Sequence, residues 1–401
     1  MKLKIIMSLV LSVGCLTAGA QQTPVVAKSI DEVLQSVRQN NKMLKAGESQ
    51  TEALKLQARS ENNLADPTVT YSHLWGNHEG MGFTGELVAS QAFDFPTLYA
   101  QRGKLNQERF RTFDAQQSAL RQQILLQTEL ACMDLIYLNR LQALLDERLH
   151  NAEELSRFYD TQLEKGATNI IEVNKIELEL LNARNETRQN EAARKAKLEE
   201  LKALNGGVAI EFTDSVYRSV LEYPVSFEAF QLEALGELPE VNELVWSEAA
   251  AERQIAVAKN QWLPNLTVGY RMNPSSGGER FNGFIVGVSI PLFSNRNKVK
   301  QAKAEHYAAN QRLSGTMKTQ TAALHQLWTK AGELKKSVDE YATVLEQQNS
   351  IALLNKAIQA GQLSMVEYFV NVTTFYQSMQ NYLQLQNDYQ KTLAEMYRFK
   401  L

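Results

Sequence analysis

Two stretches of the sequence constrain the fold most, because each reads as a pair of β-strands in a chain whose other long segments read as helix. The first stretch is Asp66–Pro96 and the second is Pro264–Phe293. Tyr71 in the first has its counterpart in Tyr270 of the second, and glycines separate the strands of each pair. Alternating apolar and polar side chains around a glycine-containing turn predict a β-hairpin. Because the whole surrounding pattern recurs as well, we interpret the chain as a duplication of one half.

The predicted strands are residues 67–75 and 83–95 in the first copy and 265–273 and 281–293 in the second. One face of these strands is apolar with aromatic ends, and the other carries small or polar side chains. Strands of about 9–11 residues with aromatic girdles are typical of outer-membrane β-barrels. A half-buried sheet in a soluble domain would show the same alternation. The predicted membrane girdle consists of Tyr71, Trp75, Phe83, Phe93, Tyr270, Phe284 and Phe293.

The strands of one chain are too few to close a barrel. In lipid, an open sheet edge leaves backbone groups without hydrogen bonds, so a membrane sheet must close. Because single-chain barrels begin at about eight strands, several chains must share one barrel, about eight strands in a dimer or twelve in a trimer. Helices of about 60–90 Å on one side would then form a hollow projecting cylinder. Such a barrel and cylinder would be a conduit from the periplasm to the outside.

Residues 1–20 read as a secretory signal peptide that is cleaved after Ala20. The apolar run within them is too short to span a bilayer as a helix. Lipidation of Cys15 is an alternative, because a glycine precedes this cysteine. In either case the protein is expected to leave the cytoplasm.

Glycine and proline fall mainly near predicted element boundaries, which leaves long uninterrupted helices between them. The stretch Lys104–Lys165 contains neither residue type, and its apolar side chains recur at helical spacing in a narrow stripe. Such a stripe suits helices that pack along a great length rather than around a compact core. Further helices are predicted at about 29–63, 169–204, 239–262, 297–359 and 364–400.

Each half is therefore predicted to consist of a helix, two strands, a long helix, a glycine-containing tip and a last helix. The first repeat covers residues 21–207 and the second covers 239–401, with a less regular linker at 208–238. The predicted fold class is mostly α with transmembrane β-strands, in a two-fold repeat.

Composition argues against several other classes of protein. The net charge of −3, without a dominant basic patch, does not favour nucleic acid as a partner. Cys132 is the only cysteine left after cleavage, so neither an intrachain disulfide nor a cysteine metal cluster is expected. His73, His78 and Met81 lie near the first outer loop, but surface loop residues are the simpler interpretation of a group without helical metal-site spacing. We find no catalytic constellation, and predict neither an enzyme nor a cofactor.

Several segments, together with the two-fold repeat in which they stand, resemble the outer-membrane factor (TolC) family. They are SIDEVLQSVRQNNKMLKA near the start, ASQAFDFP and VSIPLF at the strand ends, and EKGATNIIEV and QAGQLSMVEY at the tips. The resemblance covers nearly all of the mature chain. The short length and the FDFP…QRGK run are more similar to the heavy-metal (CzcC/CusC-like) branch than to the multidrug branch.

The resemblance implies a homotrimer in the outer-membrane lipid of a Gram-negative bacterium, with a twelve-stranded barrel continuous with a helical periplasmic tunnel. It implies that substrate arrives from an inner-membrane pump, usually of the RND type, through a periplasmic adaptor (membrane fusion protein). Divalent metal cations are the substrates that the heavy-metal branch implies. Drug export or type I secretion through the same architecture is the alternative.

In the family, the glycine-containing tips meet the adaptor, which suggests as contacts Gly166, Ala167, Thr168, Gly361, Gln362 and Leu363. Each glycine could instead serve only a helix–helix turn. Acidic residues just past the second tip line the closed periplasmic entrance in family members, and Glu367 matches this position, with Glu172 as a weaker candidate in the first copy. Three Glu367 side chains would form a cation-attracting ring, whereas a solvated surface glutamate is the alternative. Val370 departs from the second acidic position of some members.

Two other functions fit parts of the sequence. A periplasmic adaptor also has a long helical hairpin, but it has one, flanked by Gly- and Val-rich β halves that this chain lacks. A soluble coiled-coil scaffold would have no use for two alternating strand pairs with aromatic ends.

Overall fold

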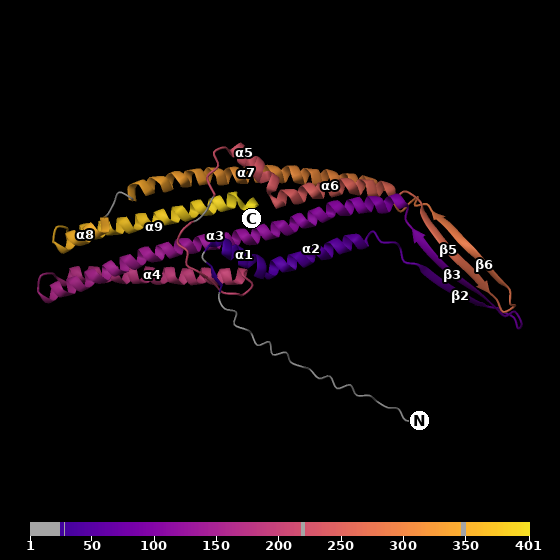
Figure 1. The fold of residues 1–401 in the computed structure, drawn as a ribbon, viewed down its shortest axis with the longest axis horizontal. Helices are drawn as coiled ribbons and strands as arrows, with labels where there is room; N and C mark the ends of the chain where they lie inside the picture. Colours follow the sequence, from indigo (N-terminus) through magenta and orange to yellow (C-terminus); the bar gives the residue numbers. More distant parts are fainter. Residues whose placement is uncertain (1–24, 28, 218–220, 346–349) are drawn as a thin grey trace, which may run out of the picture.

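The computed structural model describes residues 25–27, 29–217, 221–345 and 350–401. The predicted signal peptide and Cys15 therefore lie outside the described residues. The described part is a long bundle of helices with a four-stranded sheet at one end and two helical tips at the other (Figure 1). Among the described residues, no helix is both long and apolar enough to cross a membrane.

The helices follow the predicted order along the chain. The longest is α3 (Pro96–Glu164), whose 69 residues begin at a proline in the first turn, where a missing N–H costs nothing. At 1.5 Å per residue it extends for about 100 Å. The other helices are α1 (Ile30–Asn40), α2 (Lys42–Ser60), α4 (Ile170–Leu204), α5 (Phe227–Glu237), α6 (Pro239–Asn260), α7 (Lys298–Leu345), α8 (Ser350–Gln359), α9 (Met365–Met396) and the 3-10 turn η1 (Arg398–Lys400).

The sheet consists of β2 (Thr68–Trp75), β3 (Phe83–Phe93), β5 (Asn265–Pro274) and β6 (Arg280–Ser289), in that spatial order and antiparallel throughout. β3 pairs directly with β5, so the two predicted hairpins join into one sheet. Strands β2 and β6 form its two edges. A separate parallel pair, β1 (Val25–Ala27) with β4 (Ile210–Phe212), lies in the middle of the helical body.

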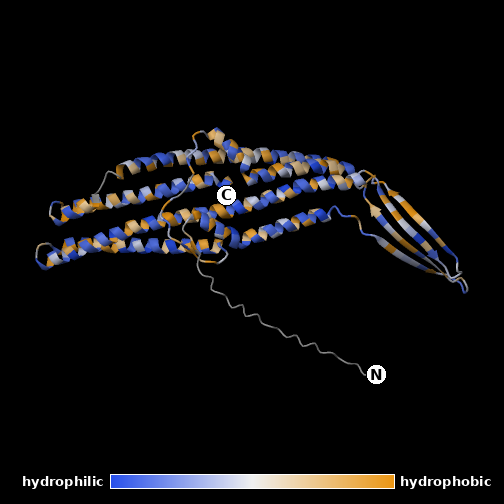
Figure 2. Ribbon diagram, in the orientation of Figure 1, coloured by the Kyte–Doolittle hydropathy of each residue, from blue (hydrophilic) through white to orange (hydrophobic). Residues whose placement is uncertain are grey.

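The register confirms the predicted strand faces. Val69 lies opposite Ala89, which lies opposite Tyr270, which lies opposite Phe284. Because neighbours in register share a face, the apolar faces of both hairpins merge into one surface. Figure 2 shows the alternation of apolar and polar residues along these strands.

The helical layer repeats the order of the sheet. α2 packs on α3, α3 packs on α6, and α6 packs on α7. Along the chain, each of these helices is next to one strand: α2 to β2, α3 to β3, α6 to β5 and α7 to β6. The spatial order of the helices is therefore the same as that of the strands. Strand order and helix order therefore describe a single curved wall, with α2 and β2 on one border and α7 and β6 on the other.

The apolar cores lie in the helical body. One cluster joins α1, α3 and the β1–β4 pair around Leu125 and Phe212. A second fills the hairpins near the tips around Ile176 and Tyr376, and a third packs α5 against α7 and α9 around Phe230. None of the described clusters contains a residue of β2, β3, β5 or β6.

Several predicted boundaries were wrong. The first helix, expected as one element to about residue 63, is broken at Asn41. The Asn41 side chain accepts hydrogen bonds from the N–H groups of Met43 (2.8 Å) and Leu44 (3.0 Å), so it caps α2. Its amide also donates to the carbonyl of Leu204 (2.7 Å), a contact with the end of α4.

Three other ends differ from the prediction. β6 ends at Ser289 rather than 293, because Pro291 has no N–H to continue the ladder. β3 ends at Phe93 rather than 95, just before the proline that opens α3. The last helix ends at Met396 and continues only as η1. The helix expected over 297–359 is described in two segments, α7 and α8.

Candidate functional site: the sheet and the hairpin tips

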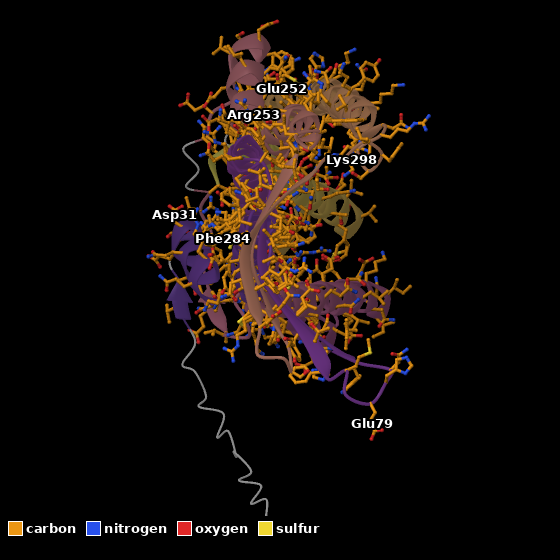
Figure 3. All side chains as sticks on the ribbon, turned by 90° about the vertical axis from the view of Figure 1, so that its right-hand side faces the viewer. Asp31, Glu79, Glu252, Arg253, Phe284 and Lys298 are labelled. Carbon is orange, nitrogen blue, oxygen red and sulfur yellow. The ribbon has the colours of Figure 1, made fainter. Side chains whose placement is uncertain are left out.

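The apolar face of the sheet is exposed in the single chain. Phe284 is 90 % exposed, Trp75 is 79 % and Val286 is 78 %. Figure 3, seen from the sheet end, shows Phe284 on β6 and Glu79 at the outer loop between β2 and β3. An apolar surface this continuous on a protein needs a partner that is not water.

The structure places all the predicted girdle residues except Phe293 on this apolar face, as the registers of Tyr71–Leu87, Trp75–Phe83, Phe93–Leu266 and Tyr270–Phe284 show. Phe293 lies beyond the end of β6 and is exposed. His73 joins the outer end of the girdle: its ring stacks on Phe83 at 4.7 Å, and its Nδ1 lies 3.1 Å from the Tyr71 hydroxyl. Its role here is packing within an aromatic group.

The two tips have the same backbone structure. Gly166 and Gly361 have φ of 66° and 72°, which disfavours any residue with a Cβ. In the first tip, the N–H of Gly166 donates to Leu163 (2.9 Å) and that of Ala167 to Gln162 (2.8 Å). The N–H groups of Gly361 and Gln362 make the equivalent bonds to Ile358 and Ala357. Both ends are Schellman motifs, so each glycine has a clear structural role.

The tip residues differ in exposure. Gly166, Ala167, Gly361 and Gln362 are exposed, and Thr168 is half-buried. Leu363 packs against the apolar cluster between the hairpins and is therefore the least available for a partner. A groove of about 400 Å³ separates the tips and is lined in part by Tyr159, Ala167, Thr168, Glu172, Gly361 and Met365.

Glu367 takes part in a capping box. Its carboxylate accepts hydrogen bonds from the N–H (2.9 Å) and hydroxyl (2.8 Å) of Ser364, and its own N–H donates to that hydroxyl. The bond from the Ser364 N–H, with that from its hydroxyl, holds the pKa of the Glu367 carboxyl below its usual value. The side chain is exposed, so a capping role and a place in an entrance ring are compatible.

Glu172 differs from its counterpart. Asn169 caps α4 by accepting from the Glu172 N–H (3.0 Å), and the Glu172 carboxylate pairs with Lys175 at 3.2 Å. Glu172 lines the groove between the tips, whereas Glu367 is not among the residues that line it. The carboxylates of Glu172 and Glu367 therefore have different local partners, Lys175 and Ser364.

Comparison with known proteins bears on these surfaces. The family described as "Outer membrane efflux protein" matches residues 232–399. This match agrees with the predicted resemblance to the outer-membrane factor family. Comparison with curated proteins finds no match.

Solved structures of outer-membrane factors share the fold over nearly the whole chain. CusC has a TM-score of 0.76 at 17% identity, covering 92% of this chain and 91% of that one. VceC of Vibrio cholerae has a TM-score of 0.72 at 14% identity, covering 92% and 95%. CmeC of Campylobacter jejuni has a TM-score of 0.70 at 15% identity, covering 100% and 93%. The shared fold agrees with the predicted resemblance to the outer-membrane factor family.

Members of the outer-membrane factor family are efflux channels rather than enzymes. In the described part of the chain, no three His, Cys, Asp or Glu side chains are grouped so that they could hold a metal ion.

Sequence reasoning missed two features of this protein. One is an ion pair between Glu86 and Arg271 on the small-residue face of the sheet. The alternation pattern contains the signal, because both are charged residues at positions of that face. The other is a buried polar network between the hairpins, for which we see no sequence signal.

Arg148 on α3 is at the centre of this network. It bonds Glu179 (2.9 Å) and Glu186 (2.7 Å) on α4, and its guanidinium lies 5.5 Å from the ring of Tyr376 on α9. The Tyr376 hydroxyl accepts from Asn151 at 3.1 Å. Burial raises the pKa of Tyr376 to about 12, so the ring stays neutral at physiological pH. The network ties α3 and α4 to α9.

Proposed function

We propose that this protein is the exit duct of a tripartite efflux system. It acts as a homotrimer and passes substrate to the outside from an inner-membrane pump of the RND type and a periplasmic adaptor. It performs no chemistry of its own. The observation that carries the proposal is a four-stranded sheet with two open edges and one exposed apolar face.

Open edges require partner chains in lipid, where every backbone N–H and C=O must find a hydrogen bond within the protein. The strands alternate in direction from β2 to β6. The β6 edge of one chain can therefore pair antiparallel with the β2 edge of the next, and three chains give a closed barrel of twelve strands. The apolar face would then meet lipid, with the aromatic residues as its girdle.

The helices support a tunnel that continues this barrel. Because α2 and α7 occupy the same borders as β2 and β6, closing the sheet also brings α7 of one chain beside α2 of the next. At about 100 Å, α3 would carry the tunnel far into the periplasm. Both tips lie at the far end, where we propose that Gly166, Gly361 and their exposed neighbours meet the adaptor.

We also propose that Glu367 and Glu172 contribute negative charge at the periplasmic entrance. Because Glu172 is held by Lys175 and faces the groove between the tips, Glu367 is the stronger candidate. For the substrate we propose divalent metal cations, on the basis of the FDFP…QRGK resemblance. A drug-export or type I secretion duct of the same architecture is the alternative.

Disulfide trapping across the open edges tests the proposal. Cysteine at Thr70 on β2 would be combined with single cysteines placed in turn over β6, while the native Cys132 remains buried. We expect outer-membrane fractions to contain covalent trimers on non-reducing gels at one or two positions of the scan. Purified protein should form conducting channels in planar bilayers. Recovery as a soluble periplasmic monomer without cross-links would overturn the proposal.

A further inference from the structure

The face of the sheet opposite the apolar face carries mostly small or polar side chains. Its members include Thr68, Thr70, Ser72, Ser90, Thr267, Gly269, Gly283, Gly287 and Ser289. Small side chains suit the concave side of a closing sheet, because they leave the enclosed space open. If the protein is the duct proposed above, this face lines the lumen of the barrel.

One ion pair interrupts this face. The Arg271 guanidinium on β5 contacts the Glu86 carboxylate on β3. In the register, Arg271 lies opposite Val88, so Glu86 is its diagonal neighbour, a position that long side chains can reach. The Arg271 side chain is 52 % exposed and that of Glu86 is 32 %, so both reach the solvent of the lumen.

Within the four described strands, Glu86 and Arg271 are the only charged side chains on this face. The remaining charged residue of these strands is Arg280. It lies four positions before Phe284 on β6 and therefore on the same, apolar face. His73 also lies on the apolar face, opposite Gly85. The strand region of the lumen therefore has one carboxylate and one guanidinium per chain, in contact, with no net charge.

We propose that Arg271 is a specificity-determining residue of the duct, and that it neutralises Glu86 so that the barrel does not retain multivalent cations. The inference rests on the proposed function, because it needs the small-residue face to enclose a lumen. A ring of three unpaired carboxylates at one level would attract and hold multivalent cations, as acidic rings do in cation channels. With Arg271 in contact with each Glu86, the exit passes charged substrates of either sign.

The test is block of single-channel current in planar bilayers by hexaamminecobalt(III) added on the side of the outer loops. The variants are Arg271→Gln, Glu86→Gln and the double variant. All three variants replace a charged side chain by a neutral polar one, at positions that are partly exposed to solvent. Addition from the outer side makes the measurement depend on the barrel rather than on the periplasmic entrance.

We expect the blocking concentration to fall about tenfold or more in Arg271→Gln, since a trivalent cation would interact with three unpaired carboxylates. Glu86→Gln should instead become sensitive to hexacyanoferrate(II), and the double variant should return to the parent. If the parent conducts and Arg271→Gln is blocked at the parent's concentration, this inference fails and the duct stands. If the parent forms no channel at all, the proposed function fails and this inference fails with it.

Discussion

The helical body buries its large apolar side chains, whereas the sheet exposes them. Leu125 and Ile136 in α3 are 0 % exposed, while Phe284 in β6 is 90 % exposed. The body also holds a largely buried ion pair between Arg148 and Glu179, whereas the sheet's pair between Glu86 and Arg271 is open to solvent. One chain therefore satisfies the body almost completely but leaves the sheet with an uncovered face and two unpaired edges. The difference fits the proposed duct, in which the body would meet water and the sheet would meet lipid and partner chains.

The largest expected effect comes from placing a charge on the exposed apolar face. Val286→Arg should prevent stable insertion in the outer membrane, because an arginine facing lipid costs about 2–4 kcal/mol per chain near the bilayer midplane. The measurement is the folded, heat-modifiable fraction on gels of membrane preparations.

Ile285→Arg is the matched control, because its side chain lies on the opposite, small-residue face. It should leave insertion intact. Equal loss of folded protein in both variants would contradict the assignment of the two faces and remove the basis of the comparison.

A smaller effect is expected in the helical body. Arg148→Ala leaves Glu179 and Glu186 without their shared partner, and should lower the free energy of unfolding of the helices by about 3 kcal/mol. The urea midpoint of the helical circular dichroism signal measures this loss.

Arg184→Ala provides the comparison within the same hairpin. Its bridge to Glu153, at 3.3 Å, is about half exposed on both sides and should contribute at most about 0.5 kcal/mol. A midpoint shift for Arg148→Ala no greater than that for Arg184→Ala would show that the buried network does not stabilise the body.

The smallest effect concerns the second tip and depends on pH. The pKa of Glu367 is lowered in the folded protein, so its capping contribution is present above the unfolded value of 4.5 and is lost as the pH falls through the lower folded value. Amide hydrogen exchange in the first turn of α9 should therefore accelerate at low pH.

The first turn of α4 is the internal reference for that measurement, because Asn169 caps it without a reciprocal carboxylate bond. After correction for the intrinsic exchange rate, its protection should change less over the same pH range. A parallel change in both turns would exclude Glu367 as the cause.

Local signals in the sequence predicted most of the fold. These signals are the glycines at the tips, the prolines at the helix starts and the alternation in the strands. Each acts within a few residues, so its structural effect can be predicted from a short segment of sequence. The break at Asn41 was not predictable in this way, because it depends on a hydrogen bond to Leu204, which is remote in the chain. The network of Arg148 likewise depends on which helices become neighbours.

In the candidate site, too, local signals predicted some features, and contacts between distant or non-equivalent residues determined the others. The aromatic face was predictable from alternation, because side chains at every second position of a strand lie on the same face of the sheet. The different partners of the two tip glutamates did not follow from the repeat: Glu172 pairs with Lys175, whereas Glu367 accepts from Ser364. Duplication of sequence therefore predicted equivalent backbones at the tips but not equivalent side-chain environments.

The unpaired borders of β2 and β6 also affect how the protein is made. In lipid, the backbone N–H and C=O groups of these edges form hydrogen bonds only with neighbouring chains. The free energy of the sheet therefore depends on the concentration of chains in the membrane. For a three-membered ring, the yield of complete barrels would rise as the third power of that concentration while copies are scarce. A twofold change in the concentration of chains would then change the number of working ducts about eightfold.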